Sequence, residues 1–261
     1  MHADSVIPLY AYDGDSKKYA SVGSAVLISH RSRRFFITAA HVMEQLQGKK
    51  TFIFFDDGFY EIGGLPAFLS DCSMFDSRNN DPIDLATICI PDNLFQESAN
   101  AKYLTLNQYQ IGLQMNSPFF QAIGYPHSQN SRAANRTVRV KGEFRAKGLR
   151  YTVTDISDSA FPYKNLDGST HIATTLTKSG SVQLSRQQTN IPDLHGISGG
   201  LLQKVCDYNH ITDSFDFAYP AGIILEKKKD NSAFFSLRLT VVFEWLDIHW
   251  ERLLTLRSSE N

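Results

Sequence analysis

The sequence has few cysteines, no long apolar run and almost no net charge, and each shortage excludes a class of protein. Its cysteines, Cys72, Cys89 and Cys206, are widely spaced and form no CxxC pair, which argues against a disulfide framework and a zinc site. No stretch reaches about 18 apolar residues, and no basic segment followed by an apolar run opens the chain. We therefore expect a soluble cytoplasmic protein with no membrane partner.

The balance of charge points to no nucleic-acid partner. Lys plus Arg number 26 and Asp plus Glu number 27, so the net charge is -1, and the whole molecule has no general attraction for polyanions. One basic run interrupts this balance, and its residues are Arg132, Arg136, Arg139, Lys141, Arg145, Lys147 and Arg150. Arg139 and Lys141 alternate with valines, which predicts a solvated strand face. A docking surface for an acidic partner or for nucleic acid is the alternative, although no interleaved aromatic pattern supports base stacking.

The pattern of short apolar segments predicts an all-β protein. Segments rich in Val, Ile, Phe and Thr recur between clusters of Gly, Asn, Asp and Ser, which is typical of sandwiches and barrels. The predicted strands lie at 22–28, 34–38, 51–55, 85–90, 119–123, 137–144, 149–154, 170–176, 200–205, 217–225 and 234–239. Apolar spacings of three and four predict a helix from Val242 to Leu256. With a boundary near 107–117, we expect two β units of similar size and then one helix.

The stretch LHGISGG, residues 194–200, places one serine among three glycines. A serine hydroxyl is a poor nucleophile unless a base takes its proton and donors stabilise the oxyanion that forms. Gly196 lacks a Cβ and can turn its N–H toward the same point as the N–H of Ser198. The stretch therefore predicts a nucleophile with an oxyanion hole. A tight turn in which Ser198 only caps a hydrogen bond is the alternative.

A base and an acid for Ser198 must come from elsewhere in the chain. In FFITAAHVME, His41 follows an apolar strand and two alanines, so its imidazole should emerge at a strand end. In NNDPIDLATICI, Asp84 directly precedes an apolar strand and could fix the tautomer of that imidazole. Asp81 precedes Pro82 and is more typical of a turn, so we prefer Asp84. A purely structural role for His41 is the alternative.

Three motifs, TAAH with His41, DLA with Asp84 and GISGG with Ser198, follow one another in the order His, Asp, Ser. Together they resemble the trypsin or chymotrypsin-like serine peptidases. The segments VGSAVLI (22–28), FQAIGYP (120–126) and AGIIL (221–225) add to the resemblance, the second of them to bacterial members.

The resemblance implies a fold of two six-stranded antiparallel β-barrels with a C-terminal α-helix and an active site between the barrels. Residues 1–112 would form the barrel that carries His41 and Asp84, residues 113–239 the barrel that carries Ser198, and residues 240–261 the helix and tail.

The resemblance also implies a reaction, a serine endopeptidase acting on a protein or peptide. Ser198 would attack a peptide carbonyl as His41 takes its proton, Asp84 would orient His41, and the N–H groups of Gly196 and Ser198 would stabilise the oxyanion. Water would then resolve the acyl-enzyme, with no cofactor and no metal. Limited proteolysis of an intracellular protein is the expected role.

Family geometry would place residues 190–195 and 225–228 around the primary specificity pocket. The candidates are Asp193, His195, Leu225 and Glu226, of which Asp193 or Glu226 could accept a basic side chain. Ile197 stands where digestive members carry an aspartate that pairs with a new N-terminus, so we expect no such zymogen switch. Activity is then constitutive or gated by a regulatory protein partner that orders residues 193–198.

Two other interpretations start from the same residues. GISGG also fits the GxSxG elbow of an α/β-hydrolase, but the preceding RQQTNIPDLH is not a buried strand, and only 63 residues follow Ser198 for the acid and the histidine. We therefore set that fold aside. A catalytically inactive trypsin-fold module that binds proteins remains open.

Overall fold

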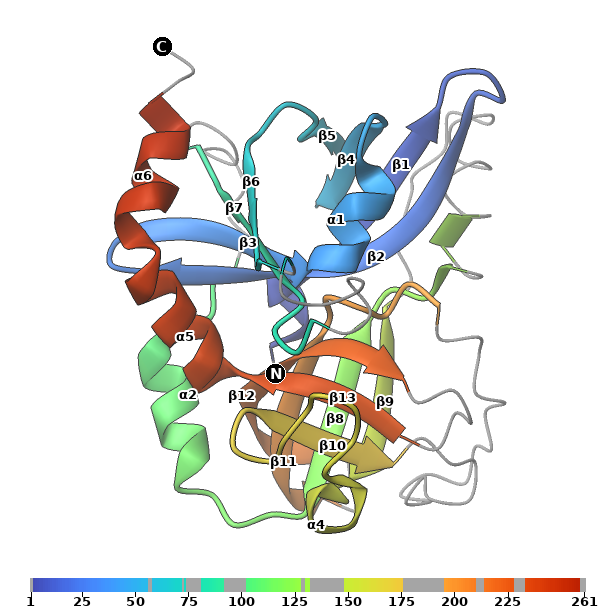
Figure 1. The fold of residues 1–261 in the computed structure, drawn as a ribbon. Helices are drawn as coiled ribbons and strands as arrows, with labels where there is room; N and C mark the ends of the chain where they lie inside the picture. Colours follow the sequence, from blue (N-terminus) through green and yellow to red (C-terminus); the bar gives the residue numbers. More distant parts are fainter. Residues whose placement is uncertain are drawn as a thin grey trace.

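Two antiparallel sheets form the body of the protein, one above the other in Figure 1. The computed structural model describes residues 2–55, 58–71, 73, 81–91, 102–127, 130–131, 148–175, 195–209, 214–227 and 233–258. The seven strands of the first sheet have the order β5-β4-β1-β2-β3-β7-β6. Their bounds are Val6–Asp13 (β1), Lys18–His30 (β2), Arg33–Ala39 (β3), Lys50–Phe55 (β4), Gly58–Glu61 (β5), Ala67–Leu69 (β6) and Leu85–Cys89 (β7).

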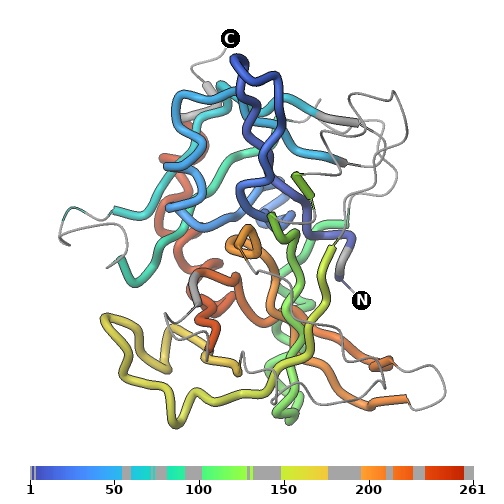
Figure 2. Tube along the Cα trace, turned by 90° about the vertical axis from the view of Figure 1, so that its right-hand side faces the viewer, coloured from blue at the N-terminus to red at the C-terminus, as the bar shows by residue number. Residues whose placement is uncertain are grey.

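The second sheet has six strands in the order β10-β13-β12-β11-β8-β9. Their bounds are Phe119–Gly124 (β8), Leu149–Thr154 (β9), His171–Thr175 (β10), Leu201–Asn209 (β11), Ser214–Lys227 (β12) and Ala233–Arg238 (β13). Figure 2 shows the same division along the chain, with the blue to cyan strands in one half and the green to orange strands in the other. The mostly β architecture predicted from the sequence is confirmed, whereas the predicted strand at 137–144 lies outside the described residues.

The closed six-stranded barrels expected from the resemblance are not observed in the described part of the chain. In the first sheet, the edge strands β5 and β6 contain only 4 and 3 residues, and no ladder joins them. In the second sheet, the edges come together through a single bridge between Asp155 and Thr174. Within the described residues, therefore, neither sheet closes by a continuous ladder.

Short helices cover the sheets. They are η1 (Ala3–Ser5), α1 (Ala40–Leu46), α2 (Leu106–Leu113), α4 (Ser157–Ala160), α5 (Leu239–Ile248) and α6 (Trp250–Ser258). The single C-terminal helix predicted from the sequence is therefore two helices with a break at His249. Asp247 of α5 accepts a hydrogen bond from His30 Nε2 at 2.8 Å and pairs with Arg31 at 2.7 Å, so the helix from the second half is tied to β2 of the first.

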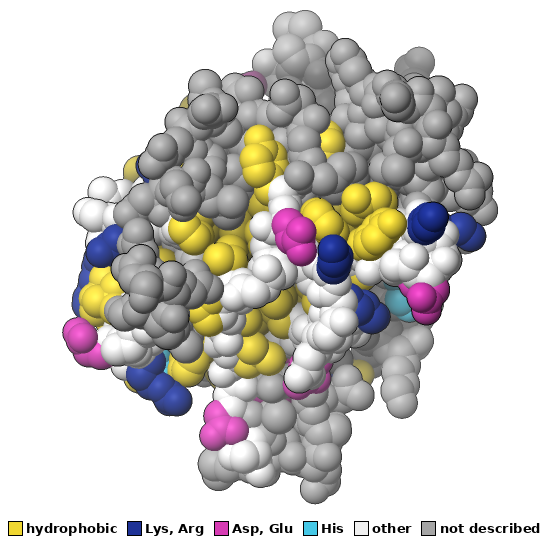
Figure 3. Space-filling view, turned by 90° about the horizontal axis from the view of Figure 1, so that it is seen from above, with side chains coloured by type: hydrophobic (Ala, Val, Ile, Leu, Met, Phe, Trp, Pro, Cys, Tyr) yellow, Lys and Arg dark blue, Asp and Glu magenta, His cyan; other side chains and the backbone are white. Residues whose placement is uncertain are grey.

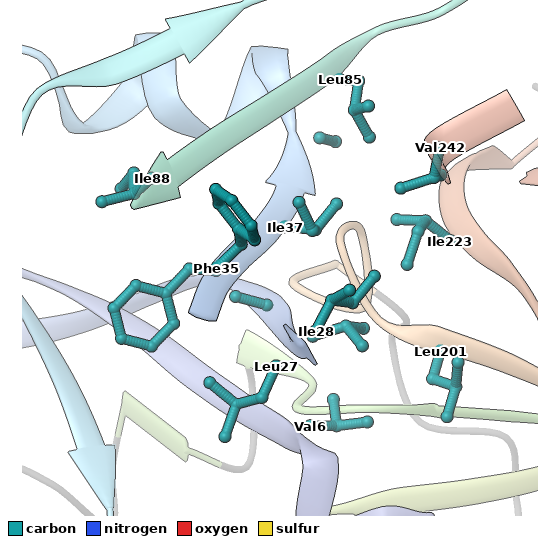
Figure 4. Packing of buried hydrophobic residues seen from close by; sticks show 14 of the residues in the cluster. Val6, Leu27, Ile28, Phe35, Ile37, Leu85, Ile88, Leu201, Ile223 and Val242 are labelled. Carbon is teal, nitrogen blue, oxygen red and sulfur yellow. The ribbon is translucent and has the colours of Figure 1, made fainter. Parts of the chain in front are cut away.

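One apolar core is shared by both sheets and α5. Leu27 and Ile37 come from the first sheet, Leu201 and Ile223 from the second, and Val242 from α5, and Figure 4 shows them packed together. All five side chains are fully buried, which favours the folded state by about 1.5–3 kcal/mol for each large aliphatic residue. The shared core fixes how the two sheets meet, and the candidate site lies at that junction.

The described surface carries charges of both signs. On the face drawn in Figure 3, Lys and Arg side chains are scattered among Asp and Glu rather than gathered in one patch. No helix in the described part of the chain combines the length and the apolar character needed to cross a bilayer. Within the same residues, no group of three His, Cys, Asp or Glu side chains is placed to hold a metal ion.

Candidate active site

His41 and Asp84 come together at the ends of two neighbouring strands. β3 ends at Ala39 and α1 begins at Ala40, so His41 lies in the first turn of α1. β3 pairs with β7 in the register Ala39 to Leu85, and Asp84 directly precedes Leu85. Because antiparallel partners lie opposite each other along a ladder, the residues just beyond that pair are also close in space.

The contact between the two side chains is short and well defined. His41 Nδ1 lies 2.6 Å from Asp84 Oδ2, and the backbone N–H of His41 donates to Asp84 Oδ1 at 2.9 Å. A carboxylate only accepts, so Nδ1 carries the hydrogen and the lone pair of a neutral ring stays on Nε2. Asp84 is only 7% exposed, which shields this contact from competition by water.

Asp84 adopts an unusual backbone conformation that its neighbours support. Its φ is +41°, a left-handed value that Asp and Asn tolerate better than most residues. Its carbonyl accepts from Ala40 N–H at 2.8 Å. Ser70 Oγ donates to Asp81 Oδ2 at 2.6 Å and accepts from Leu85 N–H at 3.0 Å. These bonds lock the turn on both sides of Asp84.

The segment around Ser198 folds as two consecutive tight turns. Gly196 has φ +93° and Gly199 has φ +80°, values at which a side chain would be strained. A Cβ on Gly196 would also lie 2.8 Å from His127 N, and one on Gly199 would overlap Ser24 O and Thr38 Oγ1. Ile197 between them is buried in the core of the second sheet. The buried side chain of Ile197 therefore holds the turn against the core of the second sheet.

The Ser198 turn and the His41 helix both lie against β2 at Gly23. A Cβ on Gly23 would stand 2.6 Å from Val42 Cγ1 and 3.3 Å from the Ser198 carbonyl oxygen. Ser24 N–H donates to that same oxygen at 2.9 Å. In Figure 2, the orange segment that begins at residue 195 lies between the two halves of the chain. The structure thus brings residues 41, 84 and 198 to one junction and holds Ser198 there by its backbone.

The predicted oxyanion donors are the backbone N–H groups of Gly196 and Ser198. No hydrogen bond between described residues engages the N–H of Gly196 or of Ser198. Nearby, burial raises the pKa of the Tyr125 phenol to about 12, so this side chain stays neutral at physiological pH.

The structure describes only some of the residues predicted to form the specificity pocket. Asp193 lies outside the described residues, and so does the side chain of Glu226, whose backbone belongs to β12. His195 is exposed, and its carbonyl accepts from His127 N–H at 2.6 Å. Leu225 is buried in the shared core. Their assignment to a specificity pocket stays a prediction. Of the basic run, Arg150 is described, in β9, and is exposed.

Sequence reasoning missed three residues that support the site. Ser24 and Ser70 bond its two turns, as described above. His171, at the start of β10, donates from Nε2 to the Pro82 carbonyl at 2.7 Å. Burial lowers the pKa of His171, and Thr170 Oγ1 lies 2.7 Å from its Nδ1. All three act across long sequence separations, so no local motif reveals them.

Comparisons with known proteins give little beyond the fold. Neither a protein-family model nor a curated protein matches the chain. Among solved structures, the chain is similar to a serine endoprotease from Yersinia pestis, at 16% sequence identity and a TM-score of 0.49. The alignment covers 97% of this chain and 64% of the other, so this chain spans less than two thirds of that protein. At these values the likeness carries no information about activity.

Proposed function

We propose that the protein is a serine endopeptidase in which Ser198 is the nucleophile, His41 the general base and Asp84 the residue that orients His41. The observation that carries the proposal is the 2.6 Å bond between His41 Nδ1 and Asp84 Oδ2. It holds a proton on Nδ1 and turns Nε2 into the acceptor that a serine nucleophile needs. The hydrogen bond between that Nε2 and the Ser198 hydroxyl is itself part of the proposal.

The proposed reaction proceeds by two acyl transfers. Ser198 Oγ bonds to the peptide carbonyl carbon as its proton passes to His41 Nε2, and the oxyanion accepts from the N–H groups of Gly196 and Ser198. His41 returns the proton to the amine as the C–N bond breaks. Water then loses a proton to His41, attacks the ester and releases the acid, and the proton returns to Ser198. Neither step consumes a cofactor.

The substrate we propose is a peptide bond in a protein, cleaved at a limited number of sites inside the cell. The Cys206 thiol, which forms no disulfide within the described part of the chain, is compatible with a reducing compartment. Gating by a protein that binds near residues 193–198 is part of the same proposal. N-terminal profiling of a proteome treated with the wild-type protein and with Ser198→Ala would identify the bonds that are cut.

Covalent labelling with a fluorophosphonate probe tests the proposed chemistry. We expect the probe to attach to one serine, mapped to residue 198 by mass spectrometry, and labelling to vanish in Ser198→Ala. His41→Ala should lower the labelling rate by about 10⁴ or more, because the base is lost. Ser16→Ala, at an exposed position in the β1–β2 hairpin, is the matched control and should label like the wild type.

An unlabelled wild-type protein would overturn the proposal and favour the inactive binding module. Labelling that survives in Ser198→Ala would equally exclude Ser198 as the nucleophile.

A further inference from the structure

We infer that Ser24, through its side-chain hydroxyl, is the positioning residue that holds the oxyanion-forming turn in its productive shape. This inference rests on the proposed function, since it concerns the N–H groups of Gly196 and Ser198. Ser24 lies on β2 of the first sheet, whereas the turn belongs to the second half of the chain. Its bonds therefore join the two sheets at the site itself.

Every polar atom of Ser24 has a partner at this junction. Its Oγ donates to Gly196 O at 3.0 Å and accepts from Tyr125 N–H at 2.9 Å. Its N–H donates to Ser198 O at 2.9 Å, and its carbonyl accepts from Thr38 Oγ1 at 2.7 Å. One residue thus holds two carbonyls of the turn, one through its side chain and one through its backbone.

Ser24 is available for these bonds because the β2–β3 ladder opens beside it. The register of this pair runs from His30 and Arg33 to Val26 and Ile37 and stops there, although β2 extends back past Ser24 and β3 continues to Ala39. A backbone N–H and C=O released from a ladder need other partners when they are buried. The Ser198 carbonyl and the Thr38 hydroxyl are these partners. The Ser198 turn therefore bonds to β2 just beyond the point where the β2–β3 ladder ends.

Planarity of the peptide group ties each carbonyl of the turn to the N–H of the next residue, which points the opposite way in a trans peptide. Gly196 O and Ser198 O thus set the Ile197 and Gly199 N–H groups, whereas the proposed donors on Gly196 and Ser198 share peptide groups with His195 O and Ile197 O. Gly200 N–H holds Ile197 O at 2.9 Å and thereby orients the Ser198 N–H. The Ser24 bonds to Gly196 O and Ser198 O fix the peptide groups directly before and after it. His127 N–H holds His195 O at 2.6 Å and thereby orients the Gly196 N–H. The peptide unit after Gly196, which lies between the two donors, is held by the Ser24 hydroxyl together with the buried Ile197 side chain.

Water cannot take over this task. Ser24 is 0% exposed, and a Cβ on the adjoining Gly124 would lie only 3.1 Å from its Oγ and 2.6 Å from Ile197 Cγ1. Removal of the hydroxyl leaves Gly196 O and Tyr125 N–H unbonded in a closely packed place. Because unpaired buried polar groups are costly, we expect the turn to rotate until these groups find other partners. That rotation would displace the N–H groups of Gly196 and Ser198.

The same strand offers a matched control. Ser21 is also on β2 and also 0% exposed, but its hydroxyl has no hydrogen-bond partner among the residues described. Ser21→Ala and Ser24→Ala therefore remove the same atom at the same burial, and they differ in whether that atom holds the turn.

Saturation kinetics of fluorophosphonate labelling test the inference. Loss of one oxyanion donor costs about 10²–10³ in turnover, so partial misplacement in Ser24→Ala should lower the limiting labelling rate about 10- to 100-fold. The half-saturating probe concentration should stay within about twofold, and the midpoint of the pH–rate profile should stay unchanged because His41 and Asp84 are untouched. Ser21→Ala should match the wild type in all three quantities.

Each result has a distinct meaning. An unlabelled wild type would defeat the proposed function and the inference together. A labelled wild type with Ser24→Ala within twofold of it would overturn the inference alone, and so would a shifted pH midpoint or an equal loss in Ser21→Ala. Should Ser24→Ala fail to fold, a crystal structure of the wild type decides: Ser24 Oγ bonded to both Gly196 O and Tyr125 N supports the inference, and loss of either bond overturns it.

Discussion

The two halves of the candidate site are held in place by different kinds of contact. The His41–Asp84 pair is fixed mainly by bonds within the first sheet, from Ala40, Ser70 and the pair itself. The Ser198 turn depends on other elements: Ser24 of β2, His127 after β8 and Ile224 of β12, whose carbonyl accepts from Gly199 N–H at 2.7 Å. The acid–base pair is therefore a local construction, whereas the nucleophile's position is a product of how the sheets meet.

This comparison predicts the largest loss of activity with the least loss of stability at Asp84. Asn keeps the shape of the side chain and tolerates the φ of +41°. Its amide can donate to Nδ1 of His41, however, which leaves the ring hydrogen on Nε2, the atom that must accept the serine proton. Asp84→Asn should lower the fluorophosphonate labelling rate by about 10⁴, with an unchanged midpoint of urea unfolding.

Asp81→Asn is the control for that experiment, because Asp81 is equally buried but bonds to Ser70 and Ile83 rather than to His41. A loss in Asp84→Asn below about tenfold, or one that Asp81→Asn reproduces, would contradict the assigned role.

At the Ser198 turn, substitutions should damage stability and activity together. Gly199→Ala adds a methyl group at φ +80° that overlaps Ser24 and Thr38, and strain plus overpacking should cost about 2–5 kcal/mol in the free energy of unfolding. Gly48→Ala is the matched control: its φ is +74°, with nothing within 4 Å of the added atom, so it should cost only about 1 kcal/mol. Equal costs in urea titrations would show that packing at the turn is loose.

Loss of the Ser70 hydroxyl should lower the free energy of unfolding by less, because its bonds hold only the turn around Asp84. Ser70→Ala leaves Asp81 and Leu85 N–H without their partner in a buried place, which should cost about 1–3 kcal/mol. Ser236→Ala removes an equally buried hydroxyl that has no partner among the described residues and should be nearly neutral. If the two variants unfold at the same urea concentration, the Ser70 bonds do not stabilise the turn.

The smallest effect should be a dependence on pH that comes from the contact between the sheets. Burial lowers the pKa of His171 below the 6.5 of an exposed histidine, so the unfolded chain binds the proton more readily. The stability that neutral His171 contributes is thus present above pH 6.5 and is lost as the pH falls from there toward its folded pKa.

His171→Gln should keep a donor for Pro82 O and flatten the pH dependence. Urea unfolding at pH 7.5 and 5.5 measures the difference, and identical pH slopes in the wild type and the variant would contradict this assignment.

The strands that are rich in β-branched and aromatic residues were predictable from the sequence. VGSAVLI and RFFIT lie within β2 and β3 as expected. β1 was missed because VIPLYAYD contains Pro8 inside the strand, a residue that normally argues against one. α2 was missed although Thr105 N–H bonds to Gln108 Oε1 at 3.0 Å, half of a capping box that TLNQ could have signalled.

The site was predictable only where residues lie beside strand ends. Asp84 and His41 each border an apolar strand, and the register of β3 and β7 converts that position into a contact. The supports of the site were not predictable, because Ser24, Ser70 and His171 act over separations of 172, 15 and 89 residues. An ordinary serine in a strand carries no local sign of such a partner.

A crystal structure of the phosphonylated protein would test the central claim most directly. We predict a bond from Ser198 Oγ to phosphorus, a phosphonyl oxygen within about 3.1 Å of the N–H groups of Gly196 and Ser198, and His41 Nε2 facing the modified oxygen while Nδ1 still bonds Asp84. A phosphonyl group on another residue, or an oxygen directed away from both N–H groups, would contradict the account.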